Sequence, residues 1–306
     1  MNHIVFIPIF KCVSEINLQK IQALCCYVLG YGGGLISGDA INLEFNVKPY
    51  ASLVVTSQST SKAFKAVPNR VATTVQTNAT VGHGGLLVLV PQPTQCFAES
   101  KFTQETKVSL ELTKYEEKLN SDTSSSNFHD SSLLLVDWYT GGRRNLDNGN
   151  WKLDSFSSTT SISYREEQNT TSADCLAFHD VTSLSGGSTL QRHMQDFNLV
   201  CMVVLIGSRV KPISQHLLDK FSSRHTFFDD YDESSDKKTS ARSANKASTP
   251  KFSARNFIRG EGLNGEDGML ISCGSFPIPS VRGHEGVILR IASKTIEQAG
   301  KCWTKF

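Results

Sequence analysis

The segment GYGGGLISGD, residues 30–39, has the glycine density of a phosphate-binding loop and ends on an acid. A dinucleotide fingerprint requires G-x-G-x-x-G, but Leu35 or Ser37 occupies the third glycine position in the two registers that otherwise fit. A P-loop requires a lysine after its last glycine, where this chain has Asp39, whose carboxylate would repel phosphate. The alternating residues that follow predict a strand, whereas a phosphate site uses a helix N-terminus. The segment is therefore not predicted to bind a nucleotide.

We expect these glycines to serve the backbone instead. Glycine permits a positive φ angle and lets two backbone segments approach closely, and both are needed where one strand turns into another. The carboxylate of Asp39 is then expected to accept hydrogen bonds from N–H groups of the loop.

Histidines, cysteines and acids do not assemble into a recognisable catalytic motif. The 8 cysteines show no C-x-x-C spacing, and no two of the 8 histidines are separated by two or four positions. His83 is either a single metal ligand or a loop residue. Asp137 and Arg143 are expected to hold a loop as an ion pair rather than to form a catalytic dyad. We predict that the protein is not an enzyme; a hydrolase using His179 or His83 is the alternative.

Composition favours a soluble, cytoplasmic protein. Of the 306 residues, 39% are hydrophobic and 20% charged, and the formal net charge of +2 gives no reason to expect nucleic acid or a membrane as a partner. The longest apolar run, Leu199–Gly207, is far too short to span a membrane and predicts a buried strand. The first residues lack the features of a secretory signal, and cysteines scattered through apolar runs are typical of a reduced protein.

Period-two alternation predicts that most of the chain is β-structure. In INLEFNV, residues 41–47, the apolar side chains fall on one face and the polar ones on the other. Further strands are predicted at 52–60, 84–93, 107–112, 132–138, 161–164, 199–207 and 286–293. Helical spacing occurs only in Leu190–Phe197, Ile213–Phe221 and 293–306. Because strands and helices do not alternate, the predicted fold is mainly β, a large multi-strand body with two or three α-helices.

Two polar stretches interrupt this pattern. Residues 116–132 form a polar insertion between two predicted strands, and 229–260 is a low-complexity insertion or linker with too little apolar surface to order itself. The predicted organisation is an atypical N-terminal segment (1–26), a main β body (27–228), the linker (229–260), and a C-terminal strand-and-helix part of the same domain (261–306).

Four blocks, in this order, resemble the urease accessory protein UreD family, called UreH in some bacteria, in its plant- and fungus-like form. They are YGGGLISGDAINLEF, LVVTSQSTSKAFKA, VLVPQPTQCFAESKFTQ and LLLVDWYTGGRRNLDNGNWKLDSF. The resemblance runs from about Tyr27 to the C-terminus, apart from the two polar insertions. Since members carry several strands ahead of the GGG block, it also implies an N-terminal truncation. The matching positions are Gly32, Gly33, Gly34, Gly38, Asp39, Thr56, Gln58, Lys62, Pro91, Pro93, Phe97, Gln104, Asp137, Trp138, Gly142, Arg143 and Trp151.

The resemblance implies a non-enzymatic maturation factor with a mainly β fold and two helices. Members of the family bind apo-urease, recruit UreF and the GTPase UreG, and are thought to pass nickel through a water-filled internal tunnel. Such a conduit needs spaced polar groups that bind the ion weakly, so nickel is expected only transiently and no tightly bound cofactor is expected. Asp39, Gln58 and Asp137 are the candidate tunnel or interface groups. The alternatives are that these side chains fix turns and strand ends, or that the chain is a degenerate relative without partner binding.

Overall fold

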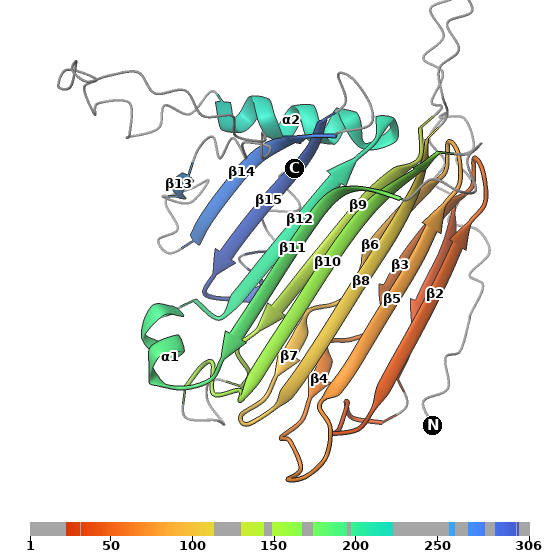
Figure 1. The fold of residues 1–306 in the computed structure, drawn as a ribbon. Helices are drawn as coiled ribbons and strands as arrows, with labels where there is room; N and C mark the ends of the chain where they lie inside the picture. The colour runs from red at the N-terminus through yellow and green to blue at the C-terminus, as the bar shows by residue number, and fades with distance from the viewer. Residues whose placement is uncertain are drawn as a thin grey trace, which may run out of the picture.

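The structure is a computed structural model that describes residues 23–30, 32–112, 130–143, 149–166, 174–194, 197–222, 257–260, 269–278, 285–297 and 299. The described residues form two β-sheets packed face to face, with one long helix on the outside of the larger sheet (Figure 1). The mainly β prediction is therefore confirmed.

The smaller sheet has five strands in the order β11-β10-β8-β5-β2. Its strands are β2 (Ala40–Val47), β5 (Thr73–Val81), β8 (Lys101–Leu112), β10 (Ser155–Glu166) and β11 (Cys175–Ser185). The inward side chains of β2 are the alternating apolar residues predicted from its sequence, while Asn42, Glu44 and Asn46 face solvent. One face of this sheet is thus buried and the other is polar.

The larger sheet has ten strands and follows the order β1-β3-β6-β9-β12-β15-β14-β13, with β4 and β7 attached beside β9. The strands are β1 (Leu24–Val28), β3 (Ser52–Ser57), β4 (Ser61–Ala63), β6 (Leu86–Val90), β7 (Thr94–Cys96), β9 (Ser132–Thr140), β12 (Leu199–Ile206), β13 (Phe257–Gly260), β14 (Met269–Pro277) and β15 (Glu285–Ser293).

Neighbouring strands in the N-terminal half pair in parallel although no helix connects them. Parallel strands need a long crossover, which is usually helical. Here the chain crosses to the opposite sheet instead: β2, β5 and β8 belong to the smaller sheet, and β3, β6 and β9 follow them in the larger one (Figure 1). Each sheet therefore provides the return path for the other, and both end up with parallel neighbours.

The connections that lead from a strand of the smaller sheet to the next strand of the larger one form corners, and hydrogen bonds join neighbouring corners. The N–H of Gly82 donates to the carbonyl of Val47, and the N–H of Ser132 donates to that of Gly85, both at 2.8 Å. A Cβ on Gly82 would lie 2.8 Å from the nitrogen of Pro49, so this corner requires glycine.

Three groups of buried side chains hold the layers together. The inner core fills the space between the sheets at the end that contains Phe45, Leu110 and Tyr164. The outer core lies between the larger sheet and α2 (Lys211–Ser222), which contributes Leu217 and Phe221. An end cluster closes the opposite end of the sandwich, with Leu35, Ala63, Cys96, Phe102, Tyr139, Trp151, Leu153 and Phe156. The strand β12 is buried on both faces because it belongs to the inner and the outer cores, which explains its unbroken apolar sequence.

Helix predictions are confirmed in part. The α2 helix confirms the prediction for Ile213–Phe221, and it follows a short 3-10 turn at Ser208–Val210. The first helix, α1 (Ser188–Met194), begins and ends earlier than predicted. The backbone carbonyl of Phe197 accepts a hydrogen bond from the indole Nε1 of Trp151, at 2.6 Å, and so makes a tertiary contact with the end cluster. Within 293–306, Ser293 is the last residue of β15, residues 294 and 295 are not helical, and residues 296, 297 and 299 are helical; residues 298 and 300–306 lie outside the described residues.

The two polar insertions lie mostly outside the described residues, which resume at 130 and at 257. The last four residues of the predicted linker form β13, which pairs antiparallel with β14. The strand predicted over 52–60 ends at Ser57, whose hydroxyl donates to the carbonyl of Ser59 and accepts from the N–H of Gln92. No helix within the described ranges is long and apolar enough to cross a membrane.

Candidate functional site

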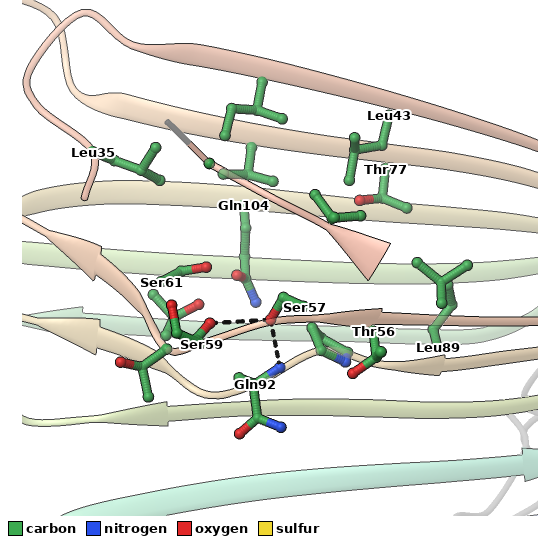
Figure 2. Close-up of a pocket in the computed structure, with 18 of the residues that line it drawn as sticks. Leu35, Leu43, Thr56, Ser57, Ser59, Ser61, Thr77, Leu89, Gln92 and Gln104 are labelled. Carbon is green, nitrogen blue, oxygen red and sulfur yellow. Dashed lines mark hydrogen bonds between the residues drawn. The ribbon is translucent and has the colours of Figure 1, made fainter. Parts of the chain in front are cut away.

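A cavity of about 550 Å³ lies between the two sheets, between the inner core and the end cluster. Its walls come from β1, β3, β6 and β9 of the larger sheet, from β2, β5 and β8 of the smaller sheet, and from the glycine segment. Figure 2 shows Leu43 and Leu89 on its apolar side and Gln104 reaching in from β8. Two sheets that each bury one face thus enclose a space that their side chains do not fill.

The polar lining of this cavity is mostly uncharged. The end of β3 and the loop after it contribute hydroxyls and an amide, among them those of Ser57 and Ser59 (Figure 2). Gln58, in the same loop, also lines the cavity and is exposed at the surface. Among the described residues that line the cavity, Asp137 and Lys62 are the ionisable ones. Amide and hydroxyl groups along the wall can each make a weak hydrogen bond to a small polar solute, and none of them would bind it tightly.

Asp137 is held between the sheets by two uncharged partners. It lies on β9, and its inward neighbours Leu135 and Tyr139 belong to the inner core and the end cluster. The amide Nε2 of Gln104 donates to Oδ1 at 2.6 Å, and the hydroxyl of Ser158 donates to Oδ2 at 2.6 Å. The same amide also donates to the hydroxyl oxygen of Ser158, at 2.9 Å, so the three side chains form a closed network.

Burial raises the pKa of the Asp137 carboxyl above its ordinary value. The hydrogen bonds from Ser158 and Gln104 oppose this shift, and the negative charge of Asp180 adds to it. Asp137 as a whole is half-buried, and it lines the cavity. A buried carboxylate whose hydrogen-bond donors are both uncharged is electrostatically costly, and a cation that reaches it would relieve that cost.

Part of the cavity wall is formed by the glycine segment, through Gly30 and residues 32–35. The N–H of Leu35 donates to the carbonyl of Lys62 at 2.7 Å, and the N–H of Phe64 donates back to the carbonyl of Leu35 at 2.9 Å. Gly34 has a φ of +154°, and a Cβ on it would lie 2.6 Å from the Lys62 carbonyl oxygen. The prediction that the glycines permit positive φ and close packing is therefore confirmed.

Two adjacent glycines give a matched test of this wall. We expect Gly34→Ala to lower the free energy of unfolding by roughly 2 kcal/mol, because the new methyl group collides with backbone. Gly33→Ala should have little effect, since its Cβ would meet nothing closer than the Phe64 ring at 3.8 Å. Denaturant unfolding of both variants measures the difference. Equal stability of the two variants would contradict this account of the wall.

Asp39 lies outside the lining of the cavity. Its carboxylate accepts a hydrogen bond from the N–H of Ile36 at 3.0 Å, and its backbone carbonyl accepts one from Thr74. It closes the turn between the glycine segment and β2, which is the arrangement expected of an acid that bonds to its own loop.

Most of the motif positions gather at the cavity. The residues that line it are Gly32, Gly33, Gly34, Thr56, Gln58, Lys62, Pro91, Gln104, Asp137 and Trp138. The motif positions outside its lining are Gly38, Asp39, Pro93, Phe97, Gly142, Arg143 and Trp151.

The expected ion pair between Asp137 and Arg143 is wrong. The guanidinium of Arg143 lies over the ring of Phe97, 4.1 Å from its centre, while Asp137 is held by Gln104 and Ser158. Trp151 is fully buried in the end cluster beside Tyr139, with ring centres 6.1 Å apart. Sequence proximity suggested the pair, but Asp137 faces the smaller sheet and Arg143 lies beyond the end of β9.

The histidines considered for catalysis lie away from the cavity lining. His83 follows β5, where its N–H donates to Glu111 and its ring meets Tyr50 edge to face. His179 contacts the hydroxyl of Ser161 through Nδ1, at 3.0 Å, on the exposed face of the smaller sheet. In the described part of the chain, three or more His, Cys, Asp or Glu side chains do not gather at any one point.

The cysteines of the described residues are free thiols, namely Cys25, Cys26, Cys96, Cys175, Cys201 and Cys273. Burial raises the pKa of Cys96 to about 12 and that of Cys273 to about 11, so both are protonated at neutral pH.

Ser158 was missed by sequence reasoning. It lies in a run of serines and threonines, SFSSTTS, where alternation between two nearly identical residue types gives no sign of which face is inward. Its position opposite Gln104 in the register of β8 and β10 places it beside Asp137.

Comparison with known proteins identifies relatives over most of the chain. The family model described as UreD urease accessory protein matches residues 15–304. Urease accessory protein D of Arabidopsis thaliana is 26% identical over 273 residues, which is 89% of this chain and 77% of that protein. Urease accessory protein D of Oryza sativa subsp. indica is 28% identical over 210 residues, covering 68% of this chain and 60% of that protein. A bacterial relative, urease accessory protein UreD of Sorangium cellulosum, is 27% identical over 198 residues, covering 64% and 54%. The chain thus spans between about half and three quarters of the length of these relatives.

Proposed function

Because the chain belongs to the UreD family of urease accessory proteins, we propose that it acts in urease maturation and helps deliver nickel to the urease active site. In this role it is an accessory protein rather than an enzyme. It binds apo-urease together with UreF and UreG, and nickel occupies it only in transit. The free thiols support a cytoplasmic setting for this work.

The observation that carries this proposal is the Asp137 carboxylate inside the cavity. Its hydrogen-bond partners are uncharged, so no cation is bonded to this buried acid when its proton leaves. A divalent cation competes with the proton for that acid, because either of them offsets the negative charge that burial disfavours. The raised pKa of Asp137 implies that cation binding competes with protonation and weakens as the pH falls.

The remaining polar lining supports passage rather than storage. Gln58, Ser57, Thr56 and Gln104 line the same cavity as Asp137, Gln58 is exposed, and the amide of Gln104 bonds to the Asp137 carboxyl. Nickel(II) accepts oxygen and nitrogen ligands, and one carboxylate among amides and hydroxyls binds it far more weakly than a cluster of histidines or thiolates would. Weak, spaced contacts allow an ion both to enter and to leave.

Complementation tests this function. The chain is expressed in cells that contain urease and the other accessory proteins but lack their own UreD, with nickel supplied, and urea hydrolysis is assayed. We expect urease activity well above the level of the empty vector. A soluble protein that gives only the empty-vector level would contradict the proposal.

Co-purification separates this function from that of a degenerate relative. We expect UreF and urease to be recovered with the chain from the complementing cells. A chain that folds but recovers neither protein has kept the fold and lost its partners.

A further inference from the structure

Polar residues continue across the sandwich beyond the cavity. In the smaller sheet the register aligns Thr77, Thr106, Thr160 and Asp180 in one row across β5, β8, β10 and β11. The neighbouring row aligns Gln104, Ser158 and Thr182. Directly paired residues point to the same face of a sheet, and Gln104 faces the cavity, so both rows face the larger sheet.

A matching row crosses the larger sheet. The register places Asp137 opposite Met202 on β12, and Met202 opposite Arg290 on β15. Met202 belongs to the inner core, so Asp137 and Arg290 share its face. The polar side chains of these three rows, which Met202 interrupts in the larger sheet, run between the inner core and the end cluster from the cavity to the edge where β11 lies over β15. We call them the polar layer.

An ion pair closes that far edge. The guanidinium Nη2 of Arg290 donates to Oδ1 of Asp180, joining the last strand of the smaller sheet to β15 of the larger one. The Asp180 side chain is 18% exposed and that of Arg290 is 46% exposed, so the acid faces inward and the base lies at the rim.

The two ends of the layer are electrostatically connected. The charge of Asp180 contributes to the raised pKa of Asp137, after the larger effect of burial. Tyr139, whose pKa burial also raises, is influenced by Asp137, Arg290 and Asp180 together. Field effects of this kind are felt over short distances through a medium that excludes water.

We propose that the Asp180–Arg290 pair gates the entry of cations into the polar layer at the edge opposite the cavity. This inference rests on the proposed function, because it assigns an entry or exit for the same divalent cation. A cation that reaches Asp180 displaces the guanidinium, which is half exposed and returns to solvent, and no bond other than this ion pair is broken. Because the guanidinium is 46% exposed, solvent screens part of the attraction, and the exchange requires less energy than the breaking of a fully buried ion pair would.

Purified, untagged protein tests the gate, with Ni²⁺ alone as the probe and Mn²⁺ as a second cation. Arg290→Gln frees the Asp180 carboxylate, and we expect Ni²⁺ affinity measured by calorimetry to rise by roughly tenfold. Asp180→Asn should produce no rise. The double variant D180N/R290Q should bind no more tightly than the wild type, because the freed carboxylate is absent.

Two results would overturn the gate: R290Q that binds Ni²⁺ as the wild type does, or D180N/R290Q that binds as tightly as R290Q. Circular dichroism checks the fold of each variant. If R290Q does not fold, Arg290→Lys decides, because a lysine keeps the positive charge but not the geometry of the guanidinium, and it should raise the affinity by a smaller factor. An unchanged affinity in the lysine variant then removes the gate.

The same variants distinguish failure of the gate from failure of the proposed function. Urease activation by the wild type is measured in the complementation cells alongside the binding. Activation without any gain of affinity in R290Q removes the gate and leaves the maturation role intact. A gain of affinity that depends on Asp180, in a wild type that activates no urease, supports the gate and contradicts the maturation role.

Discussion

Asp137→Asn is expected to reduce urease activation by at least roughly tenfold while leaving the protein folded. The substitution keeps the shape of the side chain and removes its charge, and that charge is what attracts a cation into the cavity. A tenfold loss corresponds to about 1.4 kcal/mol of lost interaction with the ion. The assay is urea hydrolysis in the complementation cells, at equal levels of soluble protein.

The same substitution should not destabilise the protein. An asparagine at 137 can still accept from Gln104 through its oxygen and can donate to the hydroxyl oxygen of Ser158 through its amide. It also removes a buried charge, so we expect a melting temperature equal to or a few degrees above that of the wild type.

The pH dependence of this comparison follows from the sign of the pKa shift. The folded state raises the pKa of Asp137 above its unfolded value, so the folded protein binds the proton more tightly than the unfolded chain does. The cost of the buried charge is therefore fully present above the folded pKa and disappears as the pH falls below the unfolded one. The stability advantage of D137N should shrink over that interval, and an advantage that grows on acidification would contradict the assignment.

Ser158→Ala provides the control for D137N. It removes one hydrogen bond to the carboxylate but keeps the charge, so urease activation should fall less than in D137N. Stability should fall by about 1 kcal/mol, because one acceptor of a buried acid loses its donor. Equal loss of activation in both variants would show that the network, and not the charge, matters.

Trp151→Ala is expected to lower the free energy of unfolding by about 3–5 kcal/mol, the largest stability effect predicted for this chain. The side chain has 0% exposure and occupies the centre of the end cluster. Its indole Nε1 donates to the carbonyl of Phe197, and its ring fits against Gly141, where a Cβ would lie 2.6 Å from a ring carbon. Since domains are typically stable by only 5–15 kcal/mol, much of the variant should be insoluble or unfolded at 37 °C.

Trp151→Phe separates packing from the hydrogen bond. It keeps an aromatic ring in the cluster and loses the donor to Phe197, so we expect a loss of about 1–2 kcal/mol relative to the wild type. Denaturant unfolding monitored by circular dichroism measures both variants. A W151A protein as stable as W151F would contradict the central place given to this side chain.

Much of this fold could be predicted because its strands alternate clearly. The alternating pattern of β2 predicts a strand with one buried face, and the continuous apolar run of β12 predicts a fully buried strand. Both strands are present. Pairing could not be predicted, because a local pattern does not show that β2 and β5 lie side by side in parallel while β3 belongs to the other sheet. In the N-terminal half the chain passes back and forth between the two sheets, and this arrangement depends on contacts between residues that are far apart in the sequence.

The site was accessible from the sequence only in part. Asp137 and Gln58 were expected to be tunnel or interface groups, and both line the cavity. Asp39 was the third candidate, but it does not line the cavity; its carboxylate accepts a hydrogen bond within its own turn instead. Asp180 and Arg290 were not considered, since they lie 110 residues apart and only the meeting of β11 with β15 brings them together.

The nickel content of urease tests the central claim most directly. Urease is purified from complementation cells expressing either the wild type or D137N, and nickel per active site is measured together with the amount of each accessory protein recovered. We predict that D137N still assembles with urease and UreF, and that its urease contains at least roughly tenfold less nickel. Full nickel content in urease matured by D137N would contradict the claim that the ion passes Asp137.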